Sequence, residues 1–404
     1  MKAILQSNTW WGAPKKFSTQ NKERKVSWLE LFYDLVYVIA IAKITGHFSE
    51  NINIGGFLDY VYFFSIIYWS WLNGSLYHDL HESEGLRTKL MTLWQIMIVA
   101  ALVITIDSNP DKIIFNITIA LMAMQLFITY LWWSVGYYDK SHKKLNLPYT
   151  ILYVFSFILM AFSLDLDQRY LRIGMFTSLI LNILPPFYSG MVLKRKNIVL
   201  NLSSTMSERL GLFAIILFGE VMAGIVTGIG QFHEFTITIW LDFGIAVILV
   251  FSLWWIFFTL ISDRLCKSGI IRSSVFELLY IPTLFALGLI SMAFKGIFKE
   301  YDSGSVDFIS LKEILGYSIC LFLFCICLLS FLLKFSSQYI HLRKKVQITL
   351  AGISVGLFIL TMLNFQVGIT IYLLIILMIL LLTIIILNLF WFAEQTENGN
   401  AEVV

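Results

Sequence analysis

Apolar residues fall into about twelve runs along the chain, each long enough to form a helix that crosses a lipid bilayer. A spanning helix needs roughly 20 predominantly apolar residues. The runs lie at about 29–48, 55–77, 88–106, 113–137, 148–164, 170–190, 207–228, 236–262, 275–294, 311–333, 346–363 and 368–391. The pattern therefore predicts an all-α protein, a polytopic transmembrane helical bundle of about 12 helices.

Turn-forming residues separate the runs and support these boundaries. Asn109-Pro110 and Asp302-Ser303-Gly304 lie between apolar runs, and Asn364 to Gly368 leaves room only for a very tight turn. Proline cannot continue a helix from its interior without losing a hydrogen bond. Pro185-Pro186 is therefore expected to close the sixth helix.

Composition agrees with lipid as the main solvent and partner. Hydrophobic residues make up 58% of the 404 residues and charged residues only 14%, and the mean hydropathy is +0.79. Ordinary soluble domains carry about a quarter charged residues. The polar, basic segment 1–25 has no apolar stretch typical of a signal peptide, so it is predicted to be a cytoplasmic N-terminal segment. The acidic segment 393–404 is predicted to be a disordered cytoplasmic tail.

Basic residues are distributed unevenly between the two sides of the predicted bundle. With the N-terminus inside and twelve crossings, most of the 29 Lys and Arg residues fall on the inner side, and the outer loops hold only Lys112, Arg169, Arg172, Lys295 and Lys299. Cytoplasmic loops carry such an excess of basic residues. We therefore expect a multi-pass protein of the cell (plasma) membrane with both termini in the cytoplasm.

Similar motifs recur in the same order in the two halves of the chain. Ser27-Trp28-Leu29-Glu30-Leu31-Phe32 opens the first helix and Met206-Ser207-Glu208-Arg209-Leu210-Gly211-Leu212-Phe213 opens the seventh. The spacing of Trp71 and Asp79 recurs in Trp255 and Asp263. Because each half would have an even number of helices, the pattern predicts two parallel six-helix repeats, 26–200 and 201–392, related by an axis along the membrane normal.

Charged residues inside the first predicted helix are candidates for function, because ionisable groups in a membrane are costly. Glu30 and Asp34 are four residues apart and therefore lie on one helix face. The alternative for Glu30 is structural, since acids are favoured at a helix N-terminus. Lys43 lies further along this helix, and its alternative role is to extend to the outer membrane surface.

The seventh helix carries Glu208, Arg209 and Glu220. Arg209 and Glu220 share one stripe of this helix, and the structural alternative is an ion pair that only docks helices. The internal repeat also places Lys43 and Glu220 at nearly the same depth, which predicts a buried pair between the repeats.

Secondary candidates lie near the predicted cytoplasmic face. They are Trp71, His78, Asp79, Arg87, Trp255, Asp263 and Arg272. A belt of aromatic residues at the membrane interface explains much of this group, and the spacing of its His and acidic residues is not diagnostic of metal. No catalytic residue is assigned. No metal site, cofactor or nucleic-acid partner is predicted, because the chain has none of their motifs.

The chain resembles the bacterial low temperature requirement protein A family. The resemblance rests on Val26-Ser27-Trp28-Leu29-Glu30-Leu31-Phe32-Tyr33-Asp34-Leu35-Val36-Tyr37-Val38-Ile39-Ala40-Ile41, on Glu208-Arg209-Leu210-Gly211-Leu212-Phe213 with Gly219-Glu220, and on the stretches from Trp71 through Asp79 to Arg87 and from Trp254-Trp255 to Asp263. It covers most of the chain and implies a multi-pass membrane protein of the cell envelope. It names no biochemical activity.

A second likeness covers the first helix only. Phe32-Tyr33-Asp34-Leu35-Val36 is similar to the Phe-Ser-Asp opening of a class of potassium-conducting channels built from six-helix units, with Tyr33 in place of the Ser. The leading hypothesis is a transporter or channel-like permease for a small solute or ion, with Asp34, Arg209 and Glu220 lining the path. The alternatives are a membrane-embedded enzyme acting on lipid or envelope precursors through Glu30, Asp34 and Asp79, and a non-catalytic membrane partner or sensor.

Overall fold

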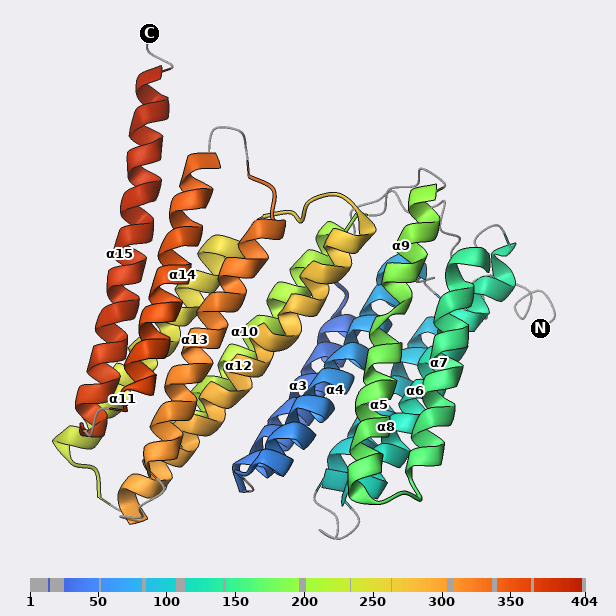
Figure 1. Ribbon diagram of the computed structural model, residues 1–404, viewed down its shortest axis with the longest axis horizontal. Coiled ribbons are helices and arrows are strands. Elements are labelled where there is room, and N and C mark those ends of the chain that lie inside the picture. Colours follow the sequence, from blue (N-terminus) through green and yellow to red (C-terminus); the bar gives the residue numbers. More distant parts are fainter. Residues whose placement is uncertain are drawn as a thin grey trace. The chain divides into compact units, whose positions relative to one another are not determined.

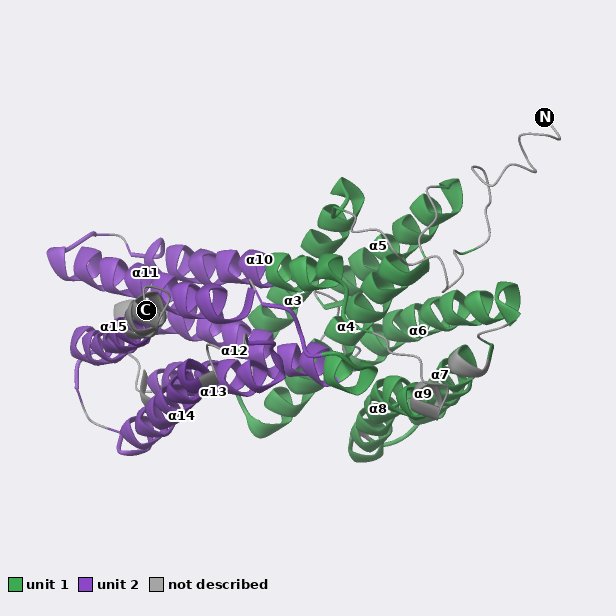
Figure 2. Ribbon diagram, turned by 90° about the horizontal axis from the view of Figure 1, so that it is seen from above, with its two compact units in different colours: residues 1–213, 268–274 green, residues 214–267, 275–404 purple. Residues whose placement is uncertain are grey.

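The protein is helical throughout the part that the computed structural model describes (Figure 1). That part comprises residue 14 and residues 25–50, 52–81, 85–106, 113–140, 143–195, 201–232, 234–262, 264–303, 308–335, 340–364 and 367–401. The chain divides into two compact units, coloured separately in Figure 2. Unit 1 comprises Met1–Phe213 and Ser268–Ser274, and unit 2 comprises Ala214–Lys267 and Val275–Val404.

Unit 1 is built, among the described residues, from seven complete helices, the first turns of an eighth and the first turn of α12 (Ile270–Ser303). The complete helices are α3 (Trp28–Glu50), α4 (Ile54–His81), α5 (Leu86–Ile106), α6 (Ile113–Tyr138), α7 (Lys143–Ser163), α8 (Gln168–Ile183) and α9 (Pro185–Arg195). The eighth is α10 (Ser204–Ile229), which continues into unit 2 beyond Phe213. Unit 2 continues with α11 (Ile237–Phe257), a π-helical turn (Phe258–Ser262), α12 (Ile270–Ser303), α13 (Phe308–Leu332), α14 (Ile340–Met362) and α15 (Ile369–Ala401).

Ten helical stretches are long and apolar enough to cross a membrane, judged on the described residues. Two of them combine consecutive elements, α8 with α9 and α11 with the π-turn. The long helices α3 and α4 complete the set of twelve and confirm the predicted polytopic helical bundle. α3 and α4 do not belong to the ten apolar spans, and α3 carries the charged residues Glu30, Asp34 and Lys43. The chain is therefore an integral membrane protein.

Several helix ends differ from the sequence prediction. α8 ends at Ile183, just before Pro185-Pro186, as the sequence predicts, but a new helix, α9, then begins at Pro185, where its missing N–H is not needed. α12 runs on to Ser303 instead of ending near 294, so Lys295 is helical rather than in a loop. α15 extends to Ala401, where the sequence predicts a disordered tail from 393. Asn364 makes the tight turn after α14 with a positive φ of 43°, a conformation that Asn tolerates better than most residues.

α4 is the central helix of unit 1. Every residue from 62 to 75 is buried, and α4 contacts α3, α6 and α8. Its polar groups are hydrogen-bonded across these contacts: Asn73 Oδ1 accepts from Tyr153 Oη at 2.7 Å and from Trp132 Nε1 at 3.2 Å. A helix that is buried on all sides can carry polar side chains in a membrane protein, because neighbouring helices rather than lipid surround it.

Unit 2 is packed around close helix contacts of its own. α11 contacts α15, and α13 contacts α14. Gly224 of α10 faces Ser291 of α12, whose Oγ donates a 3.0 Å hydrogen bond to the backbone oxygen of Glu220. Small residues at such contacts let two backbones approach closely. The two units are divided within α10, after Phe213, whereas the two six-helix repeats, 26–200 and 201–392, stay a prediction.

Candidate functional site

The start of α3 fixes the position of the first acidic side chain. Glu30 Oε2 accepts hydrogen bonds from the backbone N of Ser27 at 2.9 Å and from its Oγ at 3.0 Å. The backbone N of Glu30 in turn donates to Ser27 Oγ at 3.3 Å. This reciprocal arrangement is a capping box, the Ser-x-x-Glu signature of a helix N-terminus. The structural alternative for Glu30 is therefore correct for one of its two carboxylate oxygens.

The second carboxylate oxygen of Glu30 belongs to a buried ion-pair site with Asp34 and Arg209. Arg209 Nη1 lies 3.2 Å from Glu30 Oε1, and its Nη2 lies 2.5 Å from Asp34 Oδ1. Arg209 Nε lies 3.4 Å from Asp34 Oδ2, so the guanidinium contacts both oxygens of this carboxylate. Charge-assisted, two-pronged contacts of this kind are the strongest hydrogen bonds that side chains form.

Trp71 of α4 completes the polar contacts of the site. Its Nε1 donates a 2.7 Å hydrogen bond to Asp34 Oδ1. The guanidinium carbon of Arg209 lies 5.7 Å from the Tyr33 ring centre and 5.9 Å from the Trp71 ring centre. Phe213 packs on Trp71 with ring centres 4.3 Å apart. These rings exclude water from the ion pairs and add a cation–π attraction.

The ion-pair site is buried, and its three charged residues all belong to unit 1. The side chains of Arg209 and Asp34 have no exposed surface, and Glu30 is 2% exposed. Charges in such surroundings are tolerated only when they are paired and hydrogen-bonded. Three charged groups from α3 and α10 therefore depend on one another, and the contact joins sequence positions 175 residues apart.

The other charged candidates of the first and seventh helices do not belong to this ion-pair site. Glu208 and Lys43 are exposed in the structure. Glu220 is half-buried in unit 2. Arg209 forms ion pairs with Asp34 and Glu30, and a common role for Arg209 and Glu220 on one stripe of the helix stays a prediction. The predicted pair of Lys43 and Glu220 joins different units and stays a prediction.

The secondary candidates are dispersed, apart from Trp71. His78 is buried, with Nε2 3.2 Å from Thr92 Oγ1, and Asp79 is half-buried. Arg87 is buried and donates to Ser134 Oγ at 2.9 Å. The structure places the three later candidates as follows: Trp255 is 40% exposed, Arg272 is exposed and donates to the backbone oxygen of Ser268, and Asp263 lies outside the described residues.

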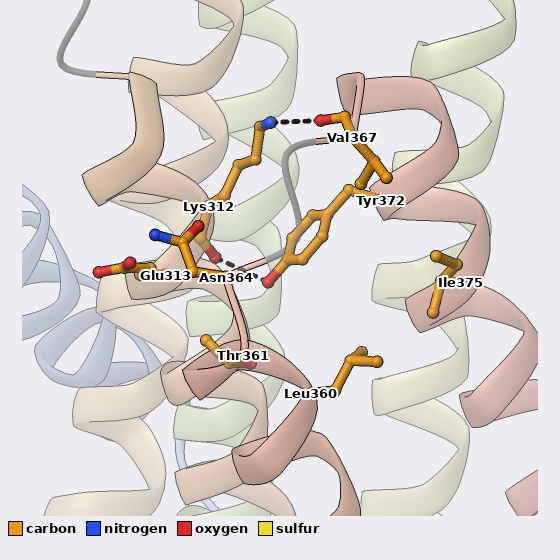
Figure 3. A pocket seen from close by; sticks show the side chains of 8 residues that line it. All are labelled: Lys312, Glu313, Leu360, Thr361, Asn364, Val367, Tyr372 and Ile375. Atoms are coloured by element: carbon orange, nitrogen blue, oxygen red, sulfur yellow. Dashed lines mark hydrogen bonds between the residues drawn. The ribbon is translucent and has the colours of Figure 1, made fainter.

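A small pocket lies in unit 2, apart from these groups (Figure 3). Its volume of about 20 Å³ holds roughly one water molecule. Lys312 Nζ donates to the backbone oxygen of Val367 at 2.6 Å, and Tyr372 Oη donates to the backbone oxygen of Lys312 at 2.8 Å. Across the described residues, no group of three His, Cys, Asp or Glu side chains could hold a metal ion. The pocket contains none of the predicted site residues.

Sequence reasoning missed three residues that shape the ion-pair site or its surroundings. Ser27 was detectable, because Ser-x-x-Glu before an apolar run is a capping signature. Gln95 was detectable as an amide within the apolar run of α5. Tyr33 gave no such signal, because its ring is an ordinary residue for a buried helix face and only the fold brings it against Arg209.

Comparison with known proteins places the chain in a family. The model of the bacterial low temperature requirement A protein (LtrA) matches residues 25–390. That range contains the capping box, the ion-pair site and α4. A search of the curated proteins finds no match. Because the family match covers most of the chain, the protein belongs to the bacterial low temperature requirement A family.

Proposed function

We propose that the protein is a transporter or channel-like permease for a small solute or ion. The observation that carries this proposal is the buried ion-pair site of Arg209 with Asp34 and Glu30. Buried ion pairs contribute little net stability compared with apolar packing, so a structural role alone does not account for three charged groups inside a membrane protein. Ionisable residues at such positions mark ion or substrate pathways in membrane proteins.

The position of the ion-pair site also favours permeation. It is formed by α3, by the central helix α4 and by the first turns of α10. α4 is enclosed by protein from 62 to 75 and carries polar groups over that length. A polar helix at the centre of a helical unit can line a path through it, whereas lipid-facing helices cannot.

The enzyme alternative requires acidic groups that are available for proton transfer. Both oxygens of Asp34 and one of Glu30 contact Arg209, and the other Glu30 oxygen caps α3. A general acid or base must come within hydrogen-bond reach of a substrate proton. These contacts occupy two of the three candidate acids, Asp79 being the third, and disfavour the enzyme over the permease. The third alternative, a membrane partner or sensor, requires no flux at all.

Purified protein in liposomes tests the proposal directly. Flux of monovalent cations, protons, chloride and small polar solutes is measured for the unmodified chain, for Asp34→Asn and for Asp59→Asn. Asp59 is the matched control, because it forms a 2.8 Å ion pair with Arg172 that is partly exposed rather than buried. We expect the unmodified chain to conduct, Asp34→Asn to reduce the flux at least several-fold, and Asp59→Asn to leave the flux close to normal. Absence of flux for every tested species in the unmodified chain overturns the permease proposal.

We also propose the plasma membrane as its location, with both termini in the cytoplasm. The support is the concentration of Lys and Arg on one side of the predicted bundle. Reporter fusions at the C-terminus and in the segment between α12 and α13 test this orientation. A cytoplasm-specific reporter should be active only at the C-terminus, and activity only between α12 and α13 overturns the orientation.

A further inference from the structure

Two buried polar side chains beside the ion-pair site have unused hydrogen-bonding groups. Tyr33 of α3 and Gln95 of α5 have no exposed surface. Tyr33 Oη and both amide atoms of Gln95 form no hydrogen bond with the described residues. Buried polar side chains in proteins nearly always have a partner, either protein or ordered water. These three atoms therefore call for a ligand that can hydrogen-bond.

The two side chains converge on one point of α4. Gly74 has no side chain there: a Cβ at this residue would overlap Tyr33 Oη and lie 2.9 Å from Gln95 Nε2. The Tyr33 phenol and the Gln95 amide therefore both lie against the Gly74 backbone, between α3, α4 and α5. Contacts of α3 with α4 and with α5 hold them in this arrangement.

Further polar groups line the same region. His78 lies one turn after Gly74, with its ring centre 6.1 Å from that of Tyr33 in an edge-to-face arrangement. His78 Nε2 lies 3.2 Å from Thr92 Oγ1, and Thr92 lies one turn before Gln95 on α5. A phenol, an amide, an imidazole and a hydroxyl therefore cluster between α3, α4 and α5.

Other buried amide side chains of unit 1 do have hydrogen-bond partners, so the lack of partners is specific to Gln95. Gln125 and Asn182 exchange two side-chain hydrogen bonds of 2.9 Å. Asn73 Oδ1 accepts hydrogen bonds from Tyr153 and Trp132. Gln95 is as deeply buried as these amides, but it points at Tyr33 and Gly74 rather than at a matching amide.

We propose that Tyr33, Gln95, His78 and Thr92 form a buried binding site for water, here called the α3–α5 water site. A buried water needs two to four polar partners, both donors and acceptors. Tyr33 and Gln95 supply both kinds. None of the four side chains carries a permanent charge, which suits water better than a tightly held ion. This further step rests on the proposed permease function: the α3–α5 water site lies on the permeation path, because Tyr33 also packs on Arg209.

Hydroxyl-radical labelling by X-ray radiolysis tests the α3–α5 water site without reference to transport. The probe is water itself, because radicals formed from bound water modify the side chains next to it. Tyr153 is the internal control, since it is equally buried but its Oη donates to Asn73. We expect Tyr33 to be labelled several-fold faster than Tyr153 in the purified full chain. Equal slow labelling of both tyrosines overturns the proposal.

Gly74→Ala is the variant that disrupts the α3–α5 water site. Its Cβ would overlap Tyr33 Oη and lie 3.0 Å from the Tyr33 ring carbon and 2.9 Å from Gln95 Nε2, so both side chains must move away from their present positions. The matched control is Gly46→Ala on α3, where a Cβ meets no atom within 4 Å. Labelling of Tyr33 should fall to the level of Tyr153 in Gly74→Ala and stay unchanged in Gly46→Ala. If Gly74→Ala does not fold, Gln95→Met serves instead, because it removes the amide at similar volume. Unchanged fast labelling of Tyr33 in the folded variant overturns the assignment to this site.

Flux in liposomes then separates the α3–α5 water site from the permease proposal. If the unmodified chain conducts and Gly74→Ala lowers flux several-fold while Gly46→Ala does not, the site lies on the path. If Gly74→Ala conducts normally, its place on the path is overturned while the permease stands. If the unmodified chain conducts nothing, the permease proposal fails, and labelling still decides whether water is bound.

Discussion

Arg209 of α10 and Asp34 of α3 form an ion pair of 2.5 Å although 175 residues separate them in the sequence. Neither side chain has exposed surface. The pair joins the motif that opens the first helix to the motif that opens the seventh, so the two most recognisable segments of the chain act at one place. Its consequences for stability, packing and electrostatics can be measured separately.

Removal of the Arg209 guanidinium should destabilise the protein strongly. Arg209→Met leaves the carboxylates of Asp34 and Glu30 buried without their cation, and breaking a buried pair in this way costs about 3–5 kcal/mol. Reversible unfolding in detergent micelles measures the loss. Arg172→Met is the control, because its ion pair with Asp59 is partly exposed and should contribute only about 0–1 kcal/mol. Equal losses for the two variants would contradict the assigned burial.

The double variant Arg209→Met with Asp34→Leu should recover part of that loss. Replacing both members of a buried ion pair by apolar residues removes the unpaired charge. We expect a coupling free energy between the two positions of about 0.5–3 kcal/mol, measured by a double-mutant cycle on the free energy of unfolding. Additive effects would mean that the two side chains do not share one site. Recovered stability without recovered flux would show that the charges serve permeation.

The capping box at Ser27 should contribute a smaller and separable amount. Ser27→Ala removes the hydroxyl that contacts Glu30 in both directions, and loss of an N-cap typically costs about 0.5–2 kcal/mol. Ser27→Asp retains an N-cap acceptor but places a second carboxylate near Glu30, whereas Ser27→Thr retains the hydroxyl. We therefore expect Ser27→Thr to be close to normal and Ser27→Ala to unfold at lower denaturant concentration. If Ser27→Ala is as stable as the unmodified chain, the capping box does not contribute to stability and Glu30 has no capping role.

Close packing of α10 on α12 predicts opposite effects at two glycines of the same helix. A Cβ at Gly224 would lie 2.6 Å from the backbone oxygen of Ser291, whereas a Cβ at Gly219 meets nothing within 4 Å. Gly224→Ala should destabilise by about 1–3 kcal/mol because the helices must separate. Gly219→Ala should be neutral or stabilise by up to about 1 kcal/mol through its helix propensity. Thermal unfolding of the two variants side by side measures the difference.

Glu220 allows a direct comparison of two possible cationic partners. Lys295 belongs to the same unit as Glu220, whereas the internal repeat predicts Lys43. Two double-mutant cycles, Glu220→Gln with Lys295→Met and Glu220→Gln with Lys43→Met, measure both couplings. We expect a coupling of at least about 0.5 kcal/mol with Lys295. A larger coupling with Lys43 would instead support the pair predicted from the repeat.

The sequence predicts the helices well because lipid imposes a simple length and polarity rule on each one. It predicts their ends less well. Lys295 has a charged side chain, which marks a loop by composition, but α12 continues past it to Ser303. Pro185 predicts the end of a helix, but proline is also favoured at the first position of a new helix.

The ion-pair site was predictable in its members but not in its contacts. Glu30, Asp34, Arg209 and Trp71 are conspicuous as polar or aromatic residues at helix positions. Spacing along one helix could only suggest that Arg209 shares a stripe with Glu220, because contacts within a helix are readable from its period. The contact of Arg209 with Asp34 depends on how α10 docks on α3, and no local pattern encodes that.

The distance in sequence between Asp34 and Arg209 has a consequence for biosynthesis. A ribosome adds about 5–20 residues per second, so α3 leaves it on the order of ten seconds or more before Arg209 exists. During that interval the Asp34 carboxylate lacks its Arg209 partner, and α3 and α4 are not among the strongly apolar spans. We therefore expect the first two long helices to complete their insertion only when α10 arrives, and a nascent chain stopped before residue 209 to leave an acidic helix without its cation.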